Sequence, residues 1–228
     1  HRITDMDSYQ QVISTIALTM GAAWASGINL YATIAVLGIL GATGNVALPS
    51  QLLVLQSPLV IGCAGLMFLV EFFADKTPGV DTGWDTIHTF IRIPAGVILA
   101  ASAVGDVSPA LVVAAGILGG TVAATSHMVK AGSRVVINTS PEPFSNWAAS
   151  LFEDFLVIGG LFTALHYPLL FLILFVLFLL LAVWLIPKLW RAIRFLGRKL
   201  RSVFSSENQS YSFDNQVQID NQTESKSQ

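Results

Sequence analysis

Two charged stretches, each lying between strongly apolar segments, constrain the fold of this chain more than any other feature. The first, residues 71–94, reads EFFADKTPGVDTGWDTIHTFIRIP and contains one Glu, three Asp, one Lys, one His and one Arg. The second, residues 127–146, reads HMVKAGSRVVINTSPEPFSN and lies between the next two apolar segments. We call these stretches the first and second polar islands, because nearly all polar chemistry of the apolar part of the chain lies in or beside them.

The surrounding sequence is too apolar for a soluble domain. Of the 228 residues, 54% are hydrophobic and only 11% are charged, whereas soluble domains contain about 25% charged residues. The composition therefore predicts an all-α, polytopic membrane helix bundle. The chain contains one cysteine, Cys63, which excludes an internal disulfide and is interpreted as a small buried apolar residue.

Six apolar segments are long enough to span a bilayer, at residues 11–42, 57–74, 86–104, 109–129, 147–165 and 169–186. The last two are divided at His166-Tyr167-Pro168, because one helix over residues 151–186 would be about 54 Å long, against a hydrocarbon core of about 30 Å. We therefore predict about six transmembrane helices within residues 11–187, preceded by an N-terminal leader at residues 1–10.

The first segment contains a candidate break. As one helix it would extend about 48 Å, and Ser26-Gly27-Ile28-Asn29 is its weakest part, since Gly and Asn both have low helix propensity. Two alternatives are open. One is a tilted continuous helix in which Asn29 is hydrogen-bonded to a neighbour, and the other is a discontinuous helix that lines a site.

The basic residues predict the orientation. The connections at residues 41–56, 105–108 and 166–168 contain no Lys or Arg, and the positive-inside rule then places both polar islands and both termini in the cytoplasm. Residues 188–204 carry basic residues on one helical side, which predicts a juxtamembrane amphipathic helix that binds anionic lipids rather than nucleic acid. Residues 205–228 are rich in Ser, Asn and Gln and are predicted to be disordered.

A twofold pattern relates residues 57–104 to residues 108–165. Each part opens with Ser-Pro, turns through a polar island, and places charge in the returning helix, at Arg92 in one and at Glu153 and Asp154 in the other. The pattern predicts an internal hairpin repeat.

Ionisable residues within or beside the spans form the first candidate site, because charge in a membrane is costly and normally faces a partner or a wet cavity. They would line a polar cavity open to the cytoplasm, or pair inside the bundle: Glu71, Asp75, Arg92, His127, Glu153, Asp154 and, at the break, Asn29. An ion pair between Arg92 and Glu153 or Asp154 would hold helices together without further function. A cavity that binds an ion or small solute is the alternative.

A second set lies in the islands, interpreted as loops: Asp81, Asp85, His88, Lys130, Ser133, Arg134 and Asn138. Asp81, Asp85 and His88 would share one helical face and could hold a divalent cation, although Asp85 also fits the N-terminal region of the next helix. Ser133 and Arg134, with residues 138–140, would hold an anion or form a hydrogen-bonded loop. The chain has no P-loop, His-Glu-x-x-His, Gly-x-Ser-x-Gly or Cys pair, so we expect no cofactor and no soluble-type enzyme.

Four strings in the chain carry a resemblance, namely SGINLY, FADKTPGVDTGWDTIHTFIRIPAG, HMVKAGSR and NTSPEPFSN. Over residues 9–187 the chain resembles an uncharacterised bacterial family of integral membrane proteins, known as a domain of unknown function. The resemblance implies a multi-span protein of the bacterial cytoplasmic (inner) membrane, and it implies no activity or catalytic residue.

Three functions remain open. The first is a small transporter or channel-like protein, expected to be a homo-oligomer because one six-span chain encloses little space. The second is a non-catalytic scaffold or assembly factor that docks partners through the two islands. The third is a membrane enzyme acting on a lipid head group, with His88 or His127 as base, for which the sequence shows no recognisable nucleophile.

Overall fold

The chain is mostly helical in the ranges that the structure describes. The computed structural model describes the backbone of residues 2–77, 79–139 and 143–225, and side chains within 7–77, 79–139 and 144–198. The elements in chain order are α1 (Arg2–Ile28), α2 (Leu30–Ala42), the 3-10 helix η1 (Ser50–Gln56), α3 (Pro58–Ala74), α4 (Val80–Ala103), α5 (Pro109–Ile137), α6 (Pro143–His166) and α7 (Pro168–Ser225). The described ranges contain no strand, which confirms the all-α fold class.

Five helices in these ranges are long and apolar enough to cross a membrane. They lie at Asp7–Ile28, Val80–Ala103, Pro109–Ile137, Phe144–His166 and Pro168–Arg198. A sixth crossing results if η1 and α3, which meet at 67°, count as one bent span. The helical membrane bundle is thus confirmed, with five or six spans.

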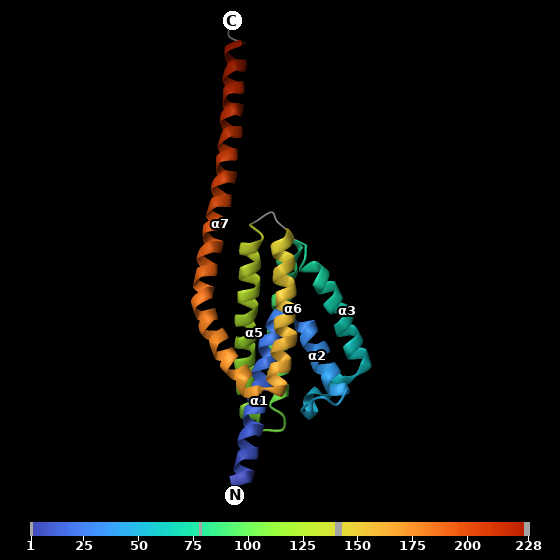
Figure 1. Cartoon of the computed structure of the whole chain (residues 1–228). Helices are drawn as coiled ribbons and strands as arrows, with labels where there is room; N and C mark the ends of the chain where they lie inside the picture. Colours follow the sequence, from blue (N-terminus) through green and yellow to red (C-terminus); the bar gives the residue numbers. More distant parts are fainter. Residues whose placement is uncertain (1, 78, 140–142, 226–228) are drawn as a thin grey trace.

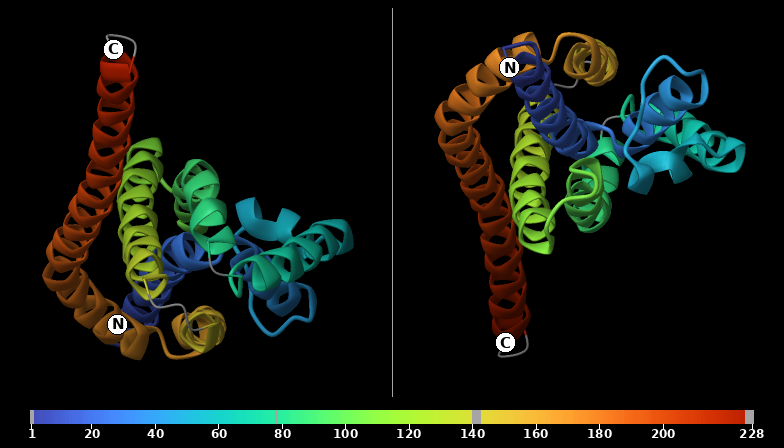
Figure 2. Two further views of the ribbon diagram at one scale, coloured as in Figure 1. Left: turned by 90° about the horizontal axis from the view of Figure 1, so that it is seen from above. Right: turned by 90° about the horizontal axis from the view of Figure 1, so that it is seen from below.

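The centre of the bundle is formed by α4 and α5, and α1 packs against both. Small residues allow this close approach: a Cβ atom on Gly119 would collide with the Cβ of Ala100, and one on Gly96 would collide with the Cβ of Ala123. Figure 2 shows α2, η1 and α3 on one side of this centre and α7 on the other. Most large apolar side chains of α7 between residues 169 and 184 are exposed, as expected for a lipid-facing helix.

Several helix ends follow the predicted signals. Pro58 and Pro109 are the first residues of α3 and α5, where the missing N–H group is not needed. Helix α6 ends at His166 and α7 begins at Pro168. Cys63, by contrast, is exposed, because α3 contacts mainly α2 and η1 and leaves this residue uncovered. Its interpretation as a buried residue is wrong.

The polar islands are largely helical, which corrects their interpretation as loops. Helix α4 already begins at Val80 and α5 continues to Ile137, so residues 80–85 and 130–137 belong to helices. The reason lies in the side chains, because the charged residues of these turns are paired inside the bundle and do not need a solvated loop.

The two ends of the chain also differ from expectation. Residues 2–10, taken as a leader, belong to α1, and α7 continues through Pro187 to Ser225. The basic stretch therefore continues the last span instead of forming a separate helix, and the tail predicted to be disordered has a helical backbone to Ser225. Between Pro187 and Gly197 no further helix-breaking residue occurs, so the proline is one isolated weak position in a long helix.

The termini lie at opposite ends of the molecule (Figure 1). Along the long axis of the molecule, α1 and α2 run in opposite directions, and α3 to α7 alternate in direction. The α3–α4 and α5–α6 connections share the end from which α7 extends. The two hairpin tips thus lie at one end of the molecule, whereas the N- and C-termini lie at opposite ends.

Candidate functional site

One residue, Asn29, separates α1 from α2. Its backbone is extended (φ −146°, ψ 99°), and its side-chain oxygen accepts a hydrogen bond from the N–H group of Ala32 at 2.9 Å. Asn is a favoured N-cap because its short amide satisfies an N–H group that the first helical turn leaves free. Gly27 lets the break lie directly on α5, since a Cβ atom there would collide with Ser126. The structure thus selects the discontinuous helix from the two alternatives.

Beside this break, seven charged side chains form one ion-pair network. They come from α3 and the residue that follows it, and from α4, α5 and α6. The cations and carboxylates of this network are Arg92, Lys130, Arg134, Glu71, Asp75, Asp85 and Glu153. The side chains of Arg92 and Glu71 are 0% exposed, and even Glu153 is only 13% exposed. The network therefore fills the interior of the bundle at the end where the islands lie, and it is closed to solvent.

Arg92 of α4 pairs with two carboxylates. It forms an ion pair with Glu71 of α3, and its Nη1 lies 2.8 Å from Oδ1 of Asp85, two turns earlier on the same helical face. The same Nη1 lies 3.3 Å from Nδ1 of His127, whose Nε2 lies 2.6 Å from the hydroxyl oxygen of Thr89. A neutral His127 with its proton on Nε2 satisfies both contacts.

Lys130 of α5 connects the network to the broken helix. Its Nζ lies 2.8 Å from Asp75 and 3.3 Å from Glu71, and it donates a hydrogen bond to the backbone oxygen of Ile28 at 3.1 Å. The last carbonyl groups of a helix carry partial negative charge and have no partner within the helix. Lys130 therefore stabilises the end of α1 and the buried carboxylates at once.

Arg134 of α5 ties α3 and α6 together. Its Nε and Nη2 donate to the two carboxylate oxygens of Glu153 at 3.1 and 2.6 Å, the bidentate geometry that makes arginine–carboxylate pairs strong. Its Nη1 donates to the backbone oxygens of Asp75 and Asn146 at 3.0 and 3.2 Å. The guanidinium thus connects the end of α3, in the first island, to the start of α6, in the second island.

Asp154 differs from the buried carboxylates of the ion-pair network. Among the described residues, it forms no ion pair with Lys, Arg or His, although it is only 9% exposed. Its Oδ1 accepts a hydrogen bond from Nδ2 of Asn29 at 3.1 Å, and its Oδ2 is buried without a hydrogen-bond partner in the described part of the chain. The residue at the helix break and an unpaired buried carboxylate are therefore in direct contact.

Lys76 is a further buried cation beside the network. It was not among the predicted site residues. Its Nζ donates to Ser150 at 3.3 Å and lies 2.8 Å from the centre of the Phe72 ring. Burial lowers the pKa of Lys76 from its ordinary value, and attraction by Asp154 and Asp75 opposes this effect. The sequence signal that could have identified Lys76 as a site residue is its position directly after Asp75 in the first island.

The ion-pair network together with Asp154 and Lys76 forms a cluster that holds more negative than positive charge. The carboxylates Glu71, Asp75, Asp85, Glu153 and Asp154 face four cations, Arg92, Lys130, Arg134 and Lys76. Four of these five carboxylates have one buried oxygen without a hydrogen-bond partner in the described residues. Because burying an uncompensated charge costs several kcal/mol, the cluster is suited to take up positive charge.

The sequence model of one family, described as a domain of unknown function (DUF4126), matches residues 16–188. The chain belongs to this family. The match contains the whole charge network and the helix break, and it ends where the basic part of α7 begins. No curated protein and no solved structure matches the chain.

The structure brings the first candidate set of this DUF4126 protein together, but with different partners from those expected. Arg92 pairs with Glu71 and Asp85, whereas Glu153 pairs with Arg134. The predicted pairing of Arg92 with Glu153 or Asp154 is therefore wrong. The side chains also close the interior instead of lining an open cavity.

The metal candidate in the second set is not supported. Asp81 accepts two hydrogen bonds from Asn138 at 2.8 and 2.9 Å, whereas Asp85 is bound by Arg92. His88 lies 3.1 Å from the hydroxyl of a tyrosine in α2. The three side chains thus have separate partners, and no group of three His, Cys, Asp or Glu in the described residues could hold a metal ion.

The anion candidate has its donors occupied. Arg134 is bound to Glu153 and to backbone oxygens, Asn138 is bound to Asp81, and Ser133 donates to a backbone oxygen one turn earlier at 2.7 Å. Residue 140 lies outside the described ranges. These contacts fit the hydrogen-bonded alternative.

Proposed function

We propose that this DUF4126 protein is a small membrane transporter or channel-like protein that moves a cation, taken here to be a proton, through the cluster at the helix break. One observation carries the proposal, namely the hydrogen bond between Asn29 at the break and the unpaired carboxylate of Asp154. Broken helices at membrane depth occur where they line ion and substrate sites. Ionisable residues within membrane spans mark ion paths and proton relays.

The geometry favours a proton over a larger cation. The unpartnered oxygens of Glu71, Asp75, Asp85 and Asp154 are buried, and the described residues contain no group of three or more His, Cys, Asp or Glu that could hold a metal ion. A proton binds to a single oxygen and needs no coordination shell, so it fits a closed cluster. Lys130 and Lys76 attract the charge of Asp154 and Asp75 repels it, so movement of these groups would change how firmly Asp154 holds its proton.

The alternatives fit less well. A docking scaffold would present its charged islands on the surface, but Asp75, Lys76, Lys130 and Arg134 are all buried. An enzyme acting on a lipid head group would need an accessible base, whereas His88 and His127 are 4% and 3% exposed.

The charge distribution supports an orientation. The connections between α3 and α4 and between α5 and α6, together with the basic part of α7, lie at one end of the molecule. We infer that this end faces the cytoplasm of a bacterial inner membrane, with the N-terminus on the other side. A homo-oligomer remains part of the proposal.

Proton flux into liposomes tests the function. The protein is reconstituted with an internal pH-sensitive dye, and a potassium diffusion potential drives protons inward. The wild type is expected to acidify the liposomes, and Asp154→Asn to lose most of this flux, because the amide keeps the shape of the side chain but carries no exchangeable acidic proton. Asp106→Asn is the matched control, since Asp106 is exposed and its carboxylate accepts a hydrogen bond from Gln51 at 2.7 Å, away from the network. A wild type without flux, or a folded Asp154→Asn with unchanged flux, would overturn the proposal.

A further inference from the structure

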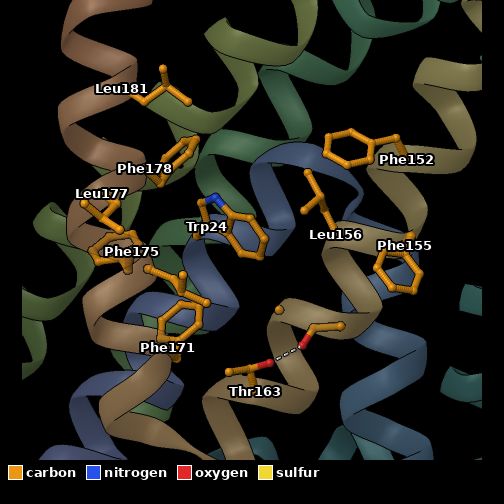
Figure 3. Close-up of a pocket in the computed structure, with 13 residues that line it drawn as sticks. Trp24, Phe152, Phe155, Leu156, Thr163, Phe171, Phe175, Leu177, Phe178 and Leu181 are labelled. Carbon is orange, nitrogen blue, oxygen red and sulfur yellow. Dashed lines mark hydrogen bonds between the residues drawn. The ribbon is translucent and has the colours of Figure 1, made fainter.

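An apolar groove of about 620 Å³ lies between α6 and α7. Figure 3 shows Trp24 of α1 between the side chains of the two helices, with Phe152, Phe155 and Leu156 on one side and Phe178 and Leu181 among those on the other. Its volume lies within the range of about 300–1,000 Å³ that is typical of ligand sites.

Two adjacent glycines shape the groove. A Cβ atom on Gly160 would collide with the indole of Trp24, whereas one on Gly159 would meet no atom within 4 Å. Among the described residues that line the groove, Thr163 is the only polar side chain besides the indole. Its hydroxyl donates to the backbone oxygen of Gly159 at 2.7 Å. The groove therefore offers hydrocarbon surface and few free polar groups, as an acyl chain requires.

The groove leads along α7 to positive charge. Leu174 and Leu181 line it, and Lys188 follows Leu181 by the same interval of seven residues, so all three lie on nearly the same helical face. Lys188 and Arg191 are exposed, and Nζ of Lys188 lies 3.2 Å from the centre of the Trp184 ring. The apolar run of α7 ends at this level, where we expect lipid phosphates to lie.

The distances suit a lipid. Half of a hydrocarbon core of about 30 Å is about 15 Å, which corresponds to about ten helical residues. A chain that descends from Lys188 over this distance reaches Phe178, which lines the groove and lies beside Trp24 with 6.0 Å between ring centres.

We propose that the groove holds an acyl chain of an anionic phospholipid, whose head group is bound by Lys188 and Arg191. This site is separate from the charge network and does not rest on the proposed transport. A second copy of the chain is a poorer occupant, because a symmetric contact along this face would bring the basic residues of two α7 helices together.

Native mass spectrometry of the full chain tests the site. Protein is released from membranes containing equal amounts of phosphatidylglycerol and phosphatidylcholine, and retained lipid is counted. The wild type is expected to retain phosphatidylglycerol. Gly159→Phe fills the groove and is expected to lose the lipid, whereas Gly62→Phe, on an exposed part of α3 with equal free space, is expected to keep it.

The head-group contribution is tested separately with Lys188→Gln/Arg191→Gln. Each basic residue near a membrane surface contributes about fivefold to the affinity for anionic lipid. The double variant is therefore expected to lose about thirtyfold of the preference for phosphatidylglycerol. Equal retention of both lipids by the wild type, unchanged retention in Gly159→Phe, or a dimer that Gly159→Phe abolishes would each overturn the proposal.

Discussion

At the scale of single residues, the site depends on which charges have partners. Arg92, Lys130 and Arg134 each contact at least two acidic side chains or backbone oxygens, whereas Asp154 is held only by Asn29 among the described residues. Breaking a buried ion pair by removing one partner is strongly destabilising, since it leaves an uncompensated charge. Asp154 is the exception, and this makes it the candidate for reversible charge uptake.

Replacing Arg92→Met should destabilise the protein by about 3–5 kcal/mol, because Glu71 and Asp85 would lose their principal cation in a cluster that is already acidic. The midpoint of thermal unfolding in detergent, followed by tryptophan fluorescence, measures this effect. Arg194→Met is the control, since Arg194 is exposed and should change stability by less than about 0.5 kcal/mol. Equal midpoints for the two variants would contradict the buried network.

Replacing Asn29→Ala should cost about 1–2 kcal/mol, because α2 loses its N-cap and Asp154 loses the hydrogen bond that the Asn29 amide donates. The same unfolding measurement applies. Asn45→Ala removes an exposed amide that is bonded to Thr43 and should have little effect. A stable, unshifted Asn29→Ala protein would argue against the broken helix.

At the scale of elements, close helix packing holds the break in place. Gly27 of α1 lies against Ser126 and the backbone of Ala123 in α5, so any larger side chain must push the two helices apart. Gly96 and Gly119 play the same role between α4 and α5. Small residues thus position both the broken helix and the two helices that carry most of the network.

Gly27→Ala is therefore expected to lower stability by about 1–3 kcal/mol through overpacking, despite the higher helix propensity of alanine. Gly65→Ala in α3 has open space around the new methyl group and should be neutral or stabilising by up to about 1 kcal/mol. Thermal midpoints of the pair measure the difference. The reverse order of stability would contradict the packing of α1 on α5.

Element positions were largely readable from the sequence, and their pairing was not. Ser-Pro pairs and His166–Pro168 mark helix ends through proline chemistry, and the Gly/Ala-rich spans indicate the centre. The partner of Arg92 depends on how α3 is placed against α4, and a local sequence pattern does not determine this placement. The charged residues of the islands predict solvent-exposed loops, whereas the structure has helices there, because these side chains have buried partners.

At the scale of the whole molecule, the reversal at Asn29 decides the topology. One extended residue reverses the direction of the chain between α1 and α2, and the two termini lie at opposite ends of the molecule. The hydropathy of the first apolar segment predicts a single span, because its composition is the same for a continuous helix and for a broken one. The backbone angle of a single residue, not composition, carries this information.

This topology predicts opposite labelling of two loop positions. In a Cys63→Ala background, Asn45→Cys should react with a membrane-impermeant thiol reagent in intact cells, whereas Thr139→Cys should react only after the membrane is opened. Residue 45 follows α2 and residue 139 follows α5, at opposite ends of the bundle. Labelling of both from the same side would refute the arrangement.

The central claim is that the broken helix presents Asp154 as a buried site for a proton. Infrared spectroscopy of the reconstituted protein at about pH 5, where exposed carboxylates are still ionised, measures it directly through the carbonyl band of a protonated carboxylic acid. We expect this band in the wild type and in Asp106→Asn, and its loss in Asp154→Asn. A wild type without such a band, or a band that persists unchanged in Asp154→Asn, would contradict the account.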